Sequence, residues 1–110
     1  MSLYGDYIKE REGRDIVESE KGFATYQIFK DGQCYLQDLY VAPEHRESHV
    51  ATEMANTVSQ IAKEAGCTRL VGSVWMGDKN ASKNMSIFLK YGMRLHSVKD
   101  QVVYLITDLS

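Results

Sequence analysis

The sequence predicts an α+β fold built on a mixed sheet, most of whose strands are antiparallel. Three observations support this: β-type runs with turn residues extend from Asp15 to Val41, a long helix-period segment separates two such runs, and two more runs close the chain. A helix that connects two strands of one sheet makes them parallel, whereas short hairpin turns make strands antiparallel. With 110 residues, the chain is long enough for one domain, so we expect residues 1–110 to form a single domain.

Three strands are predicted ahead of the long helix. The segment Asp15–Glu20 alternates weakly between apolar and polar residues, and Gly22–Phe29 is rich in β-forming side chains. Asp31-Gly32 is a pair typical of a tight hairpin turn. We therefore expect the run Gln33–Val41 to return antiparallel to the strand before it.

Two helices and a strand are predicted in the middle of the chain. The segment Glu47–Ala65 has a helical period, and Gly66 stands where a C-terminal cap belongs. Its apolar face comprises Val50, Met54, Val58, Ile61, Ala62 and Ala65. The continuous apolar run Arg69–Met76 predicts a strand buried on both faces, and a second helix, Ala81–Tyr91, ends at Gly92.

The chain is expected to close with two strands, Met93–Val98 and Gln101–Asp108, joined at Lys99-Asp100. The predicted order of elements is therefore β-β-β-α-β-α-β-β. It begins with a strand, and its central strand–helix–strand unit supplies the one parallel crossover.

Composition argues against several classes of function. The net charge of −2, from 13 basic and 15 acidic residues, gives no overall attraction to nucleic acid or anionic membrane, and no nucleic-acid-binding motif is present. No apolar run approaches the roughly 20 residues that span a bilayer, and no signal peptide precedes the first charges. We expect a cytoplasmic protein with neither nucleic acid nor membrane as a partner.

The cysteines and histidines do not form a metal-binding pattern. Cys34 and Cys67 stand far apart, so we expect two buried, free thiols of a reducing compartment. His45 and His49 are four residues apart, but Arg46 occupies the position where the helical zinc pattern requires glutamate. We expect no metal site.

The motifs resemble those of the GNAT superfamily of N-acetyltransferases. Its members carry a strand that ends in V-x-P-x-x-R, then an R/Q-x-x-G-x-G/A turn and a long helix. This chain reads Val41-Ala42-Pro43-Glu44-His45-Arg46 and then Glu47-Ser48-His49-Val50-Ala51. The second helix resembles the K-x-G-F signature with Lys90-Tyr91-Gly92-Met93. The resemblance covers roughly Asp15 to the C-terminus and implies a GNAT-like fold with acetyl-CoA as cosubstrate, lacking most of the N-terminal strand and helix that build one wall of the acceptor site.

The resemblance also implies where acetyl-CoA would bind. The pyrophosphate would lie on unpaired backbone N–H groups at the start of the helix, where the helix dipole favours negative charge. These cofactor-binding residues are Arg46, Glu47, Ser48, His49, Val50 and Ala51. Backbone groups of Leu39, Tyr40 and Val41 would hold the thioester and the pantetheine amides. Asn80 and Asn84 would bond the pantetheine arm, although Asn80 equally suits a helix cap.

His49 replaces the first glycine of the turn. In one reading the turn keeps right-handed helical dihedrals, the imidazole points toward solvent or phosphate, and binding survives. In the other reading, the side chain fills the space where the pyrophosphate would bind and blocks it. Because N-terminal positions of a helix have ordinary right-handed geometry, we expect the first.

The catalytic positions depart from those of the family. The strand Tyr35–Val41 resembles the LEDLYV form of polyamine-type members, whose first carboxylate is a general base. Gln37 stands there, and an amide can only orient a water or the amine. Asp38 is the remaining carboxylate, either catalytic or a solvated or ion-paired strand residue. Phe88 replaces the tyrosine that protonates the leaving thiolate, and Tyr91 close by is either that acid or a packing residue.

These features predict an acetyl-CoA-dependent N-acetyltransferase that moves an acetyl group to a primary amine by direct attack on the thioester. The alternative is a catalytically weak or inactive module of the same fold, serving as a structural or partner-binding domain. The acceptor, a small-molecule or protein amine, would be shaped by Tyr4, Tyr7, His96 and Tyr104. Because the N-terminal wall is short, we expect a homodimer in which a second chain covers exposed sheet.

Overall fold

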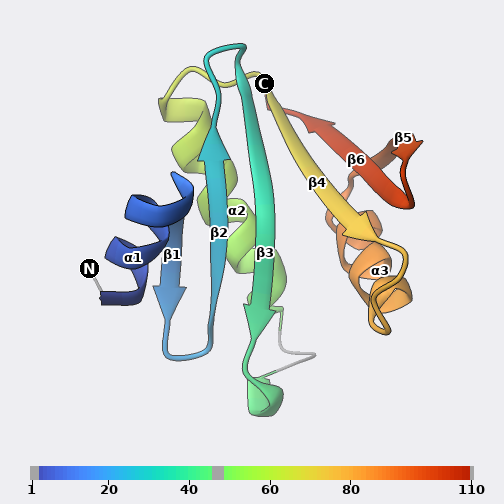
Figure 1. Ribbon diagram of the computed structural model, residues 1–110, viewed down its shortest axis with the longest axis horizontal. Coiled ribbons are helices and arrows are strands. Elements are labelled where there is room, and N and C mark those ends of the chain that lie inside the picture. The colour runs from blue at the N-terminus through green and yellow to red at the C-terminus, as the bar shows by residue number, and fades with distance from the viewer. Residues whose placement is uncertain (1–2, 46–48, 110) are drawn as a thin grey trace.

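Six strands form one sheet in the computed structural model, which describes residues 3–45 and 49–109 (Figure 1). The elements in chain order are α1 (Leu3–Glu12), β1 (Asp15–Ser19), β2 (Gly22–Ile28), β3 (Gln33–Val41), a 3-10 turn η1 (Pro43–His45), α2 (Val50–Glu64), β4 (Arg69–Trp75), α3 (Ala81–Tyr91), β5 (Arg94–Lys99) and β6 (Val102–Asp108).

The strands lie in the order β1-β2-β3-β4-β6-β5. β3 and β4 are parallel and joined through α2, and every other neighbouring pair is antiparallel. The predicted α+β class with a mixed sheet and a central strand–helix–strand crossover is therefore confirmed.

The N-terminal helix α1 was not predicted, so the expected order, which begins with a strand, is wrong at this end. The apolar side chains of α1 whose burial the structure describes, Leu3, Tyr4 and Tyr7, are all exposed and form no buried stripe. Its later residues are straight-chain charged ones that favour a helix without tertiary packing. Gly13, at a φ of 71°, ends the helix and donates its N–H to the carbonyl of Lys9 at 3.0 Å.

The last hairpin turns one residue later than predicted. Asp100 and Gln101, rather than Lys99 and Asp100, are the central residues, with φ values of 51° and 67°. Positive φ at both central residues matches the twist of a two-residue hairpin. β5 is exposed along its whole length and forms one edge of the sheet.

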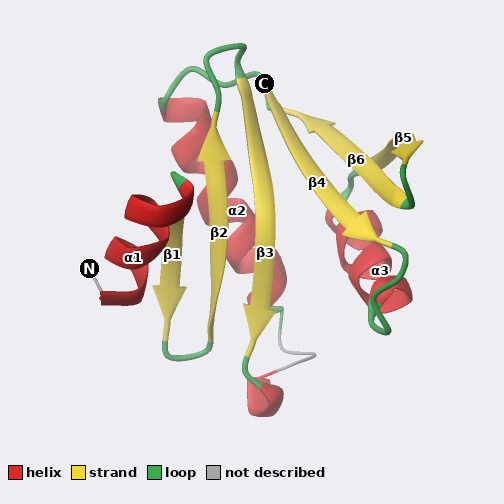
Figure 2. Ribbon diagram, viewed as in Figure 1, coloured by secondary structure: helices red, strands yellow, loops and turns green. Residues whose placement is uncertain are grey.

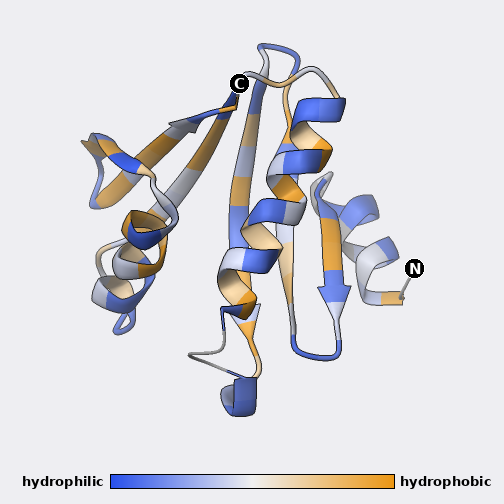
Figure 3. Cartoon of the chain, turned by 180° about the vertical axis from the view of Figure 1, so that it is seen from behind, coloured by the Kyte–Doolittle hydropathy of each residue, from blue (hydrophilic) through white to orange (hydrophobic). Residues whose placement is uncertain are grey.

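The core lies between the sheet and α2, which crosses the sheet on one face (Figure 3). Val50, Met54, Val58 and Ala62 are buried as predicted, and each large apolar side chain so buried contributes roughly 1.5–3 kcal/mol. Ala65, by contrast, is exposed, because it lies past the last turn of α2 as the C-cap. No helix within the described residues has both the length and the apolar character needed to cross a membrane.

Both cysteines are buried and free, as predicted. Burial raises the pKa of the Cys34 thiol to about 12, with a smaller contribution from the charge of Cys67. Burial also raises the pKa of Cys67. Neither environment favours a reactive thiolate.

The ladder between β3 and β4 is short. It pairs Gln33–Leu36 with Arg69–Gly72, and the two strands then diverge toward their C-terminal ends (Figure 2). Phe88 of α3 packs against this point, since a Cβ placed on Gly72 would lie 3.1 Å from its ring. Because the ladder ends at the pair Leu36 and Gly72, β3 and β4 are not hydrogen-bonded to each other beyond Leu36.

Candidate functional site

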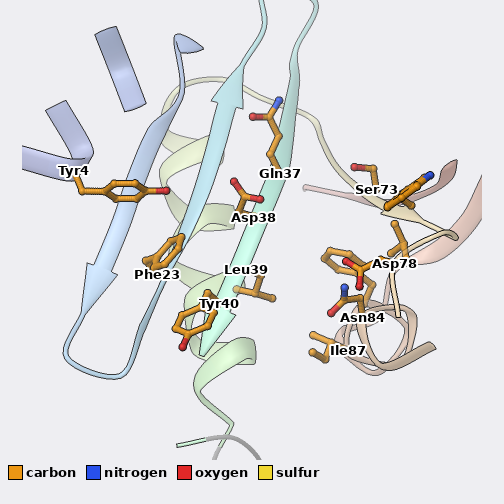
Figure 4. Close-up of a pocket in the computed structure, with 13 residues that line it drawn as sticks. Tyr4, Phe23, Gln37, Asp38, Leu39, Tyr40, Ser73, Asp78, Asn84 and Ile87 are labelled. Atoms are coloured by element: carbon orange, nitrogen blue, oxygen red, sulfur yellow. The ribbon is translucent and has the colours of Figure 1, made fainter. Parts of the chain in front are cut away.

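A cavity of about 540 Å³ lies where β3 and β4 diverge. Residues of β2 and β3, with Tyr4 of α1, line one side of it (Figure 4). The end of β4, the loop after it and α3 line the other side, where Figure 4 shows Asp78, Asn84 and Ile87. The cavity therefore joins segments from both halves of the sheet.

A β-bulge in β3 brings Gln37 and Asp38 to the cavity together. Leu36 pairs with Tyr26 and Asp38 pairs with Thr25, so Gln37 has no opposing residue on β2. Cys34 and Leu36 are buried and face the core, whereas Gln37 and Asp38 are both exposed. Adjacent side chains of a regular strand would point to opposite faces. The bulge allows both side chains to be exposed on the same side, and both line the cavity (Figure 4).

Asp38 is held by two partners on the N-terminal side of the sheet. Arg14 forms an ion pair with its carboxylate, and the Thr25 hydroxyl donates a hydrogen bond to Oδ2 at 2.8 Å. The side chain of Asp38 nevertheless remains 49% exposed. Asp38 is therefore the ion-paired residue of the structural reading, and it also lies on the wall of the cavity.

Gln37 is free to meet a ligand. Its exposed side-chain amide makes no hydrogen bond with any residue in the described part of the chain. It can therefore donate to or accept from a water or an amine in the cavity, which is the role the sequence predicts for an amide at this position.

Three aromatic rings line the wall next to Asp38. Phe23 stacks on Tyr40, its cross-strand partner, with 5.4 Å between ring centroids, and Tyr4 meets Phe23 edge to face at 5.6 Å. Phe23 was not predicted at the site, because its place depends on the register between β2 and β3. Tyr4 lines the cavity as expected for an acceptor-shaping residue, although Tyr7, His96 and Tyr104 do not.

The two asparagines differ in position. Asn84 lines the cavity, and Asn80 does not. Asn80 is the N-cap residue of α3, but its side chain makes no capping hydrogen bond. Its backbone N–H donates to Oδ1 of Asp78 at 2.8 Å. Only Asn84 lies where a ligand arm in the cavity could meet it.

Tyr91 lies outside this cavity, so the structure does not bring it together with Gln37 and Asp38. Its hydroxyl shares a 2.8 Å hydrogen bond with Ser59 of α2, and its ring packs against the core. It faces a separate cavity of about 500 Å³ beside Lys63. The packing reading of Tyr91 is therefore the one that the contacts favour. Phe88, which lines the first cavity, has no proton to give.

His49 has left-handed dihedrals, with φ 65° and ψ 11°. The expectation that it keeps right-handed helical geometry is wrong. It precedes the first residue of α2, where the chain changes direction before the helix, and its carbonyl accepts the N–H of Glu53 at 3.0 Å. Glycine adopts this conformation readily, which explains a glycine at this position in the motif. Its side chain is exposed and forms no cap.

The remaining cofactor-binding predictions divide into three groups. Arg46, Glu47 and Ser48 lie outside the described residues. Val50 and Ala51 form the first turn of α2, whose N–H groups have no partner within the helix. Leu39, Tyr40 and Val41 follow the point at which the β3–β4 ladder stops. Within the part of the chain that the structure describes, no three His, Cys, Asp or Glu side chains gather as a metal site requires.

Comparisons with known proteins agree with this architecture. The thialysine N-epsilon-acetyltransferase of Bos taurus is 29% identical over 72 residues, which is 66% of this chain and 42% of that protein. The chain thus spans less than half of the length of this relative. An acetyltransferase of Bacillus subtilis in complex with CoA has a TM-score of 0.73 at 12% identity, covering 96% of this chain and 84% of that one.

The PaiA N-acetyltransferase of Thermoplasma acidophilum, in complex with coenzyme A, has a TM-score of 0.76 at 17% identity, covering 96% of this chain and 69% of that one. At such identities these two likenesses concern the fold. The model of the acetyltransferase (GNAT) family matches residues 6–85, which is most of the chain. The chain therefore belongs to the acetyltransferase (GNAT) family.

Proposed function

We propose that the protein is an acetyl-CoA-dependent N-acetyltransferase that moves an acetyl group to a primary amine. The observation that carries this proposal is the opening between β3 and β4, with Gln37 and Asp38 on its wall. Family membership and the amine named in the bovine relative support the same reaction.

The residues present fit acetyl-CoA as the cosubstrate. The unpaired N–H groups of Val50 and Ala51 suit a pyrophosphate, and α2 begins behind the C-terminal end of β3 (Figure 1). An extended arm could then enter the opening past Leu36, where Asn84 offers a side-chain amide. The relatives from Bacillus subtilis and Thermoplasma acidophilum bind CoA on the same fold.

The chemistry would depend mainly on positioning. A thioester is already activated, and holding an amine against it supplies much of the rate enhancement without an acid or base. Gln37 and Asp38 would orient the amine. As the C–N bond forms and the C–S bond breaks, the nitrogen would lose its proton to solvent. CoA would leave as the thiolate, because Phe88 offers no proton. The acceptor would have to arrive as the free amine, so the rate should rise with pH toward the pKa of the acceptor.

The alternative is a weak or inactive member of the family that serves as a structural or partner-binding module. It is favoured by Gln37 and Phe88, which replace the base and the acid expected from the resemblance. Acetyl-CoA binding alone does not decide between the readings, since an inactive module could retain it.

Two measurements test the proposal. Acetyl-CoA at 100 times its dissociation constant should stabilise the fold by about 2.7 kcal/mol, which corresponds to a thermal shift of roughly ten degrees or more. Release of free CoA should then depend on an added amine, with thialysine and lysine as the first acceptors. A protein that shows the thermal shift but releases no CoA with any primary amine would support the module instead.

We also propose that the protein is a homodimer. β5 is an edge strand, and its Leu95 and Val98 side chains are 61% and 69% exposed. Such an edge is a ready site for pairing with a second copy. Light scattering should give twice the chain mass at micromolar concentration, and a clean monomer would contradict the proposal.

A further inference from the structure

Arg14 links the connection after α1 to the strands β2 and β3 beside the cavity. It lies in the connection between α1 and β1, and its side chain is only 14% exposed. Its Nη1 donates to the hydroxyl of Thr25 on β2 at 3.1 Å and to the carboxylate of Asp38 on β3. Nothing in the sequence spacing connects these residues, which are brought together by the register of the strands.

Hydrogen bonds join the three side chains to one another. The Thr25 hydroxyl donates its one proton to Oδ2 of Asp38, so its lone pairs remain available to Arg14. Thr25 is fully buried and is the β2 partner of Asp38, directly beside the bulge. The anchor for the carboxylate is therefore rigid, and Arg14 completes it.

All of these contacts fall on one oxygen of Asp38. Both Arg14 and Thr25 donate to Oδ2, and Oδ1 makes no hydrogen bond with any residue in the described ranges. Asp38 is half exposed and projects from β3 at the cavity wall, as Figure 4 shows. The second oxygen thus keeps its lone pairs for a donor in the cavity, with the rotation of the carboxylate already fixed.

We propose that Arg14 is a positioning residue for the acceptor: it holds Asp38 so that Oδ1 accepts a hydrogen bond from the acceptor amine. This inference rests on the proposed function. A guanidinium suits the role because its planar fork can reach two acceptors, whereas a lysine offers a single point charge. Fixing a carboxylate before the ligand arrives removes part of the ordering cost of binding.

A purely structural role for Arg14 makes different predictions. If Arg14 only tied α1 to the sheet, its replacement would change thermal stability. The KM values for the amine and for acetyl-CoA would then change equally, or neither would change. An arginine that acts through Asp38 would weaken the amine and leave acetyl-CoA unchanged. The discriminating quantity is therefore the ratio of the two KM changes, not stability.

The experiment is a double-mutant cycle on full-length protein with Arg14→Gln, Asp38→Asn and the combined variant. The readouts are KM for thialysine, KM for acetyl-CoA, and calorimetric binding of thialysine to the CoA-loaded protein. We expect each single variant to raise KM and Kd for thialysine about ten-fold, because an interaction with an ionised group is weakened. The combined variant should be no worse than Asp38→Asn alone, since Arg14 acts only through that carboxylate.

Two controls complete the design. Arg94→Gln removes another arginine–aspartate contact, the 3.4 Å pair with Asp108 on the last hairpin, and should leave both KM values unchanged. Arg14→Lys keeps the charge and should recover part of the affinity for thialysine, which also covers the case in which Arg14→Gln fails to fold.

Three outcomes would overturn the inference. Multiplicative effects in the combined variant, or equal changes in both KM values, would show that Arg14 does not act through Asp38 while leaving the acetyltransferase proposal intact. Acetyl-CoA binding without thialysine binding or CoA release would count against both proposals. These results are distinguishable because CoA binding and amine binding are measured separately.

Discussion

Replacing His49 with glycine should stabilise the protein. A side-chain-bearing residue in left-handed geometry costs roughly 1–2 kcal/mol, whereas glycine adopts it freely. His49 has a φ of 65°, and its exposed side chain makes no capping bond that the change would remove. The greater conformational freedom of glycine in the unfolded chain lowers the free energy of unfolding by roughly 0.5–1 kcal/mol. We therefore expect a net gain of about 0.5–1 kcal/mol.

The assay is urea unfolding of His49→Gly beside two matched variants. His49→Ala removes the same exposed side chain but keeps the unfavourable φ, so it should not gain stability. The stability of His49→Asn should lie between those of the alanine and glycine variants, because asparagine tolerates left-handed geometry. In a thermal scan of the same variants, the glycine variant should unfold about 2–6 °C higher than the parent protein.

A loss of about 0.5–1 kcal/mol in His49→Gly would refute the reasoning. That loss is what glycine causes inside a right-handed helix, and it would mean that α2 begins earlier than Val50. If His49→Ala gained as much as His49→Gly, the histidine side chain itself, not the backbone, would be the source of strain.

Three further predictions concern the cavity and the core. Gln37→Glu should raise acetyl transfer near neutral pH by up to about a hundred-fold, because a carboxylate on the bulge can accept the proton of the amine; Gln60→Glu, on α2, is the control. Gly72→Ala should lower the free energy of unfolding by about 1–3 kcal/mol in urea, since its Cβ would lie 3.1 Å from the Phe88 ring, and Phe88→Leu should restore part of the loss. Burial raises the pKa of Cys34 from its usual 9.0 to about 12, so the folded thiol should resist thiol reagents at pH 8. Stability should fall as pH rises from about 9 toward 12, because only the unfolded thiol ionises there. Rapid labelling of folded Cys34, an unchanged Gly72→Ala, or an inactive Gln37→Glu would each contradict the corresponding argument.

The strands and the two later helices could be predicted from the sequence because local patterns decide them. The face of α2 follows a strict helical period, and the turn at Asp31-Gly32 joins two β-rich runs. α1 was missed because its residues favour a helix without an apolar stripe, and the signal used for the other helices was that stripe.

The arrangement of the candidate site required three-dimensional information. The bulge at Gln37 exists only relative to β2, so no local pattern along β3 shows that two adjacent side chains face one cavity. The partner of Asp38 lies 24 residues away at Arg14, with no motif to connect them. The dihedrals of His49 depend on how the chain enters α2, and a helical period gives no information about them.

The short β3–β4 ladder has a consequence for the cooperativity of folding. Four residue pairs connect the β1–β2–β3 half of the sheet to the β4–β6–β5 half. In a sheet joined so narrowly, the second half could open as a unit while the first stays folded, and its amide hydrogens would then exchange with solvent sooner. A ligand that spanned the opening would bond to both halves at once. It would then act as an additional strand of the sheet, and slow amide exchange would extend across β4 and β6 only while it remained bound.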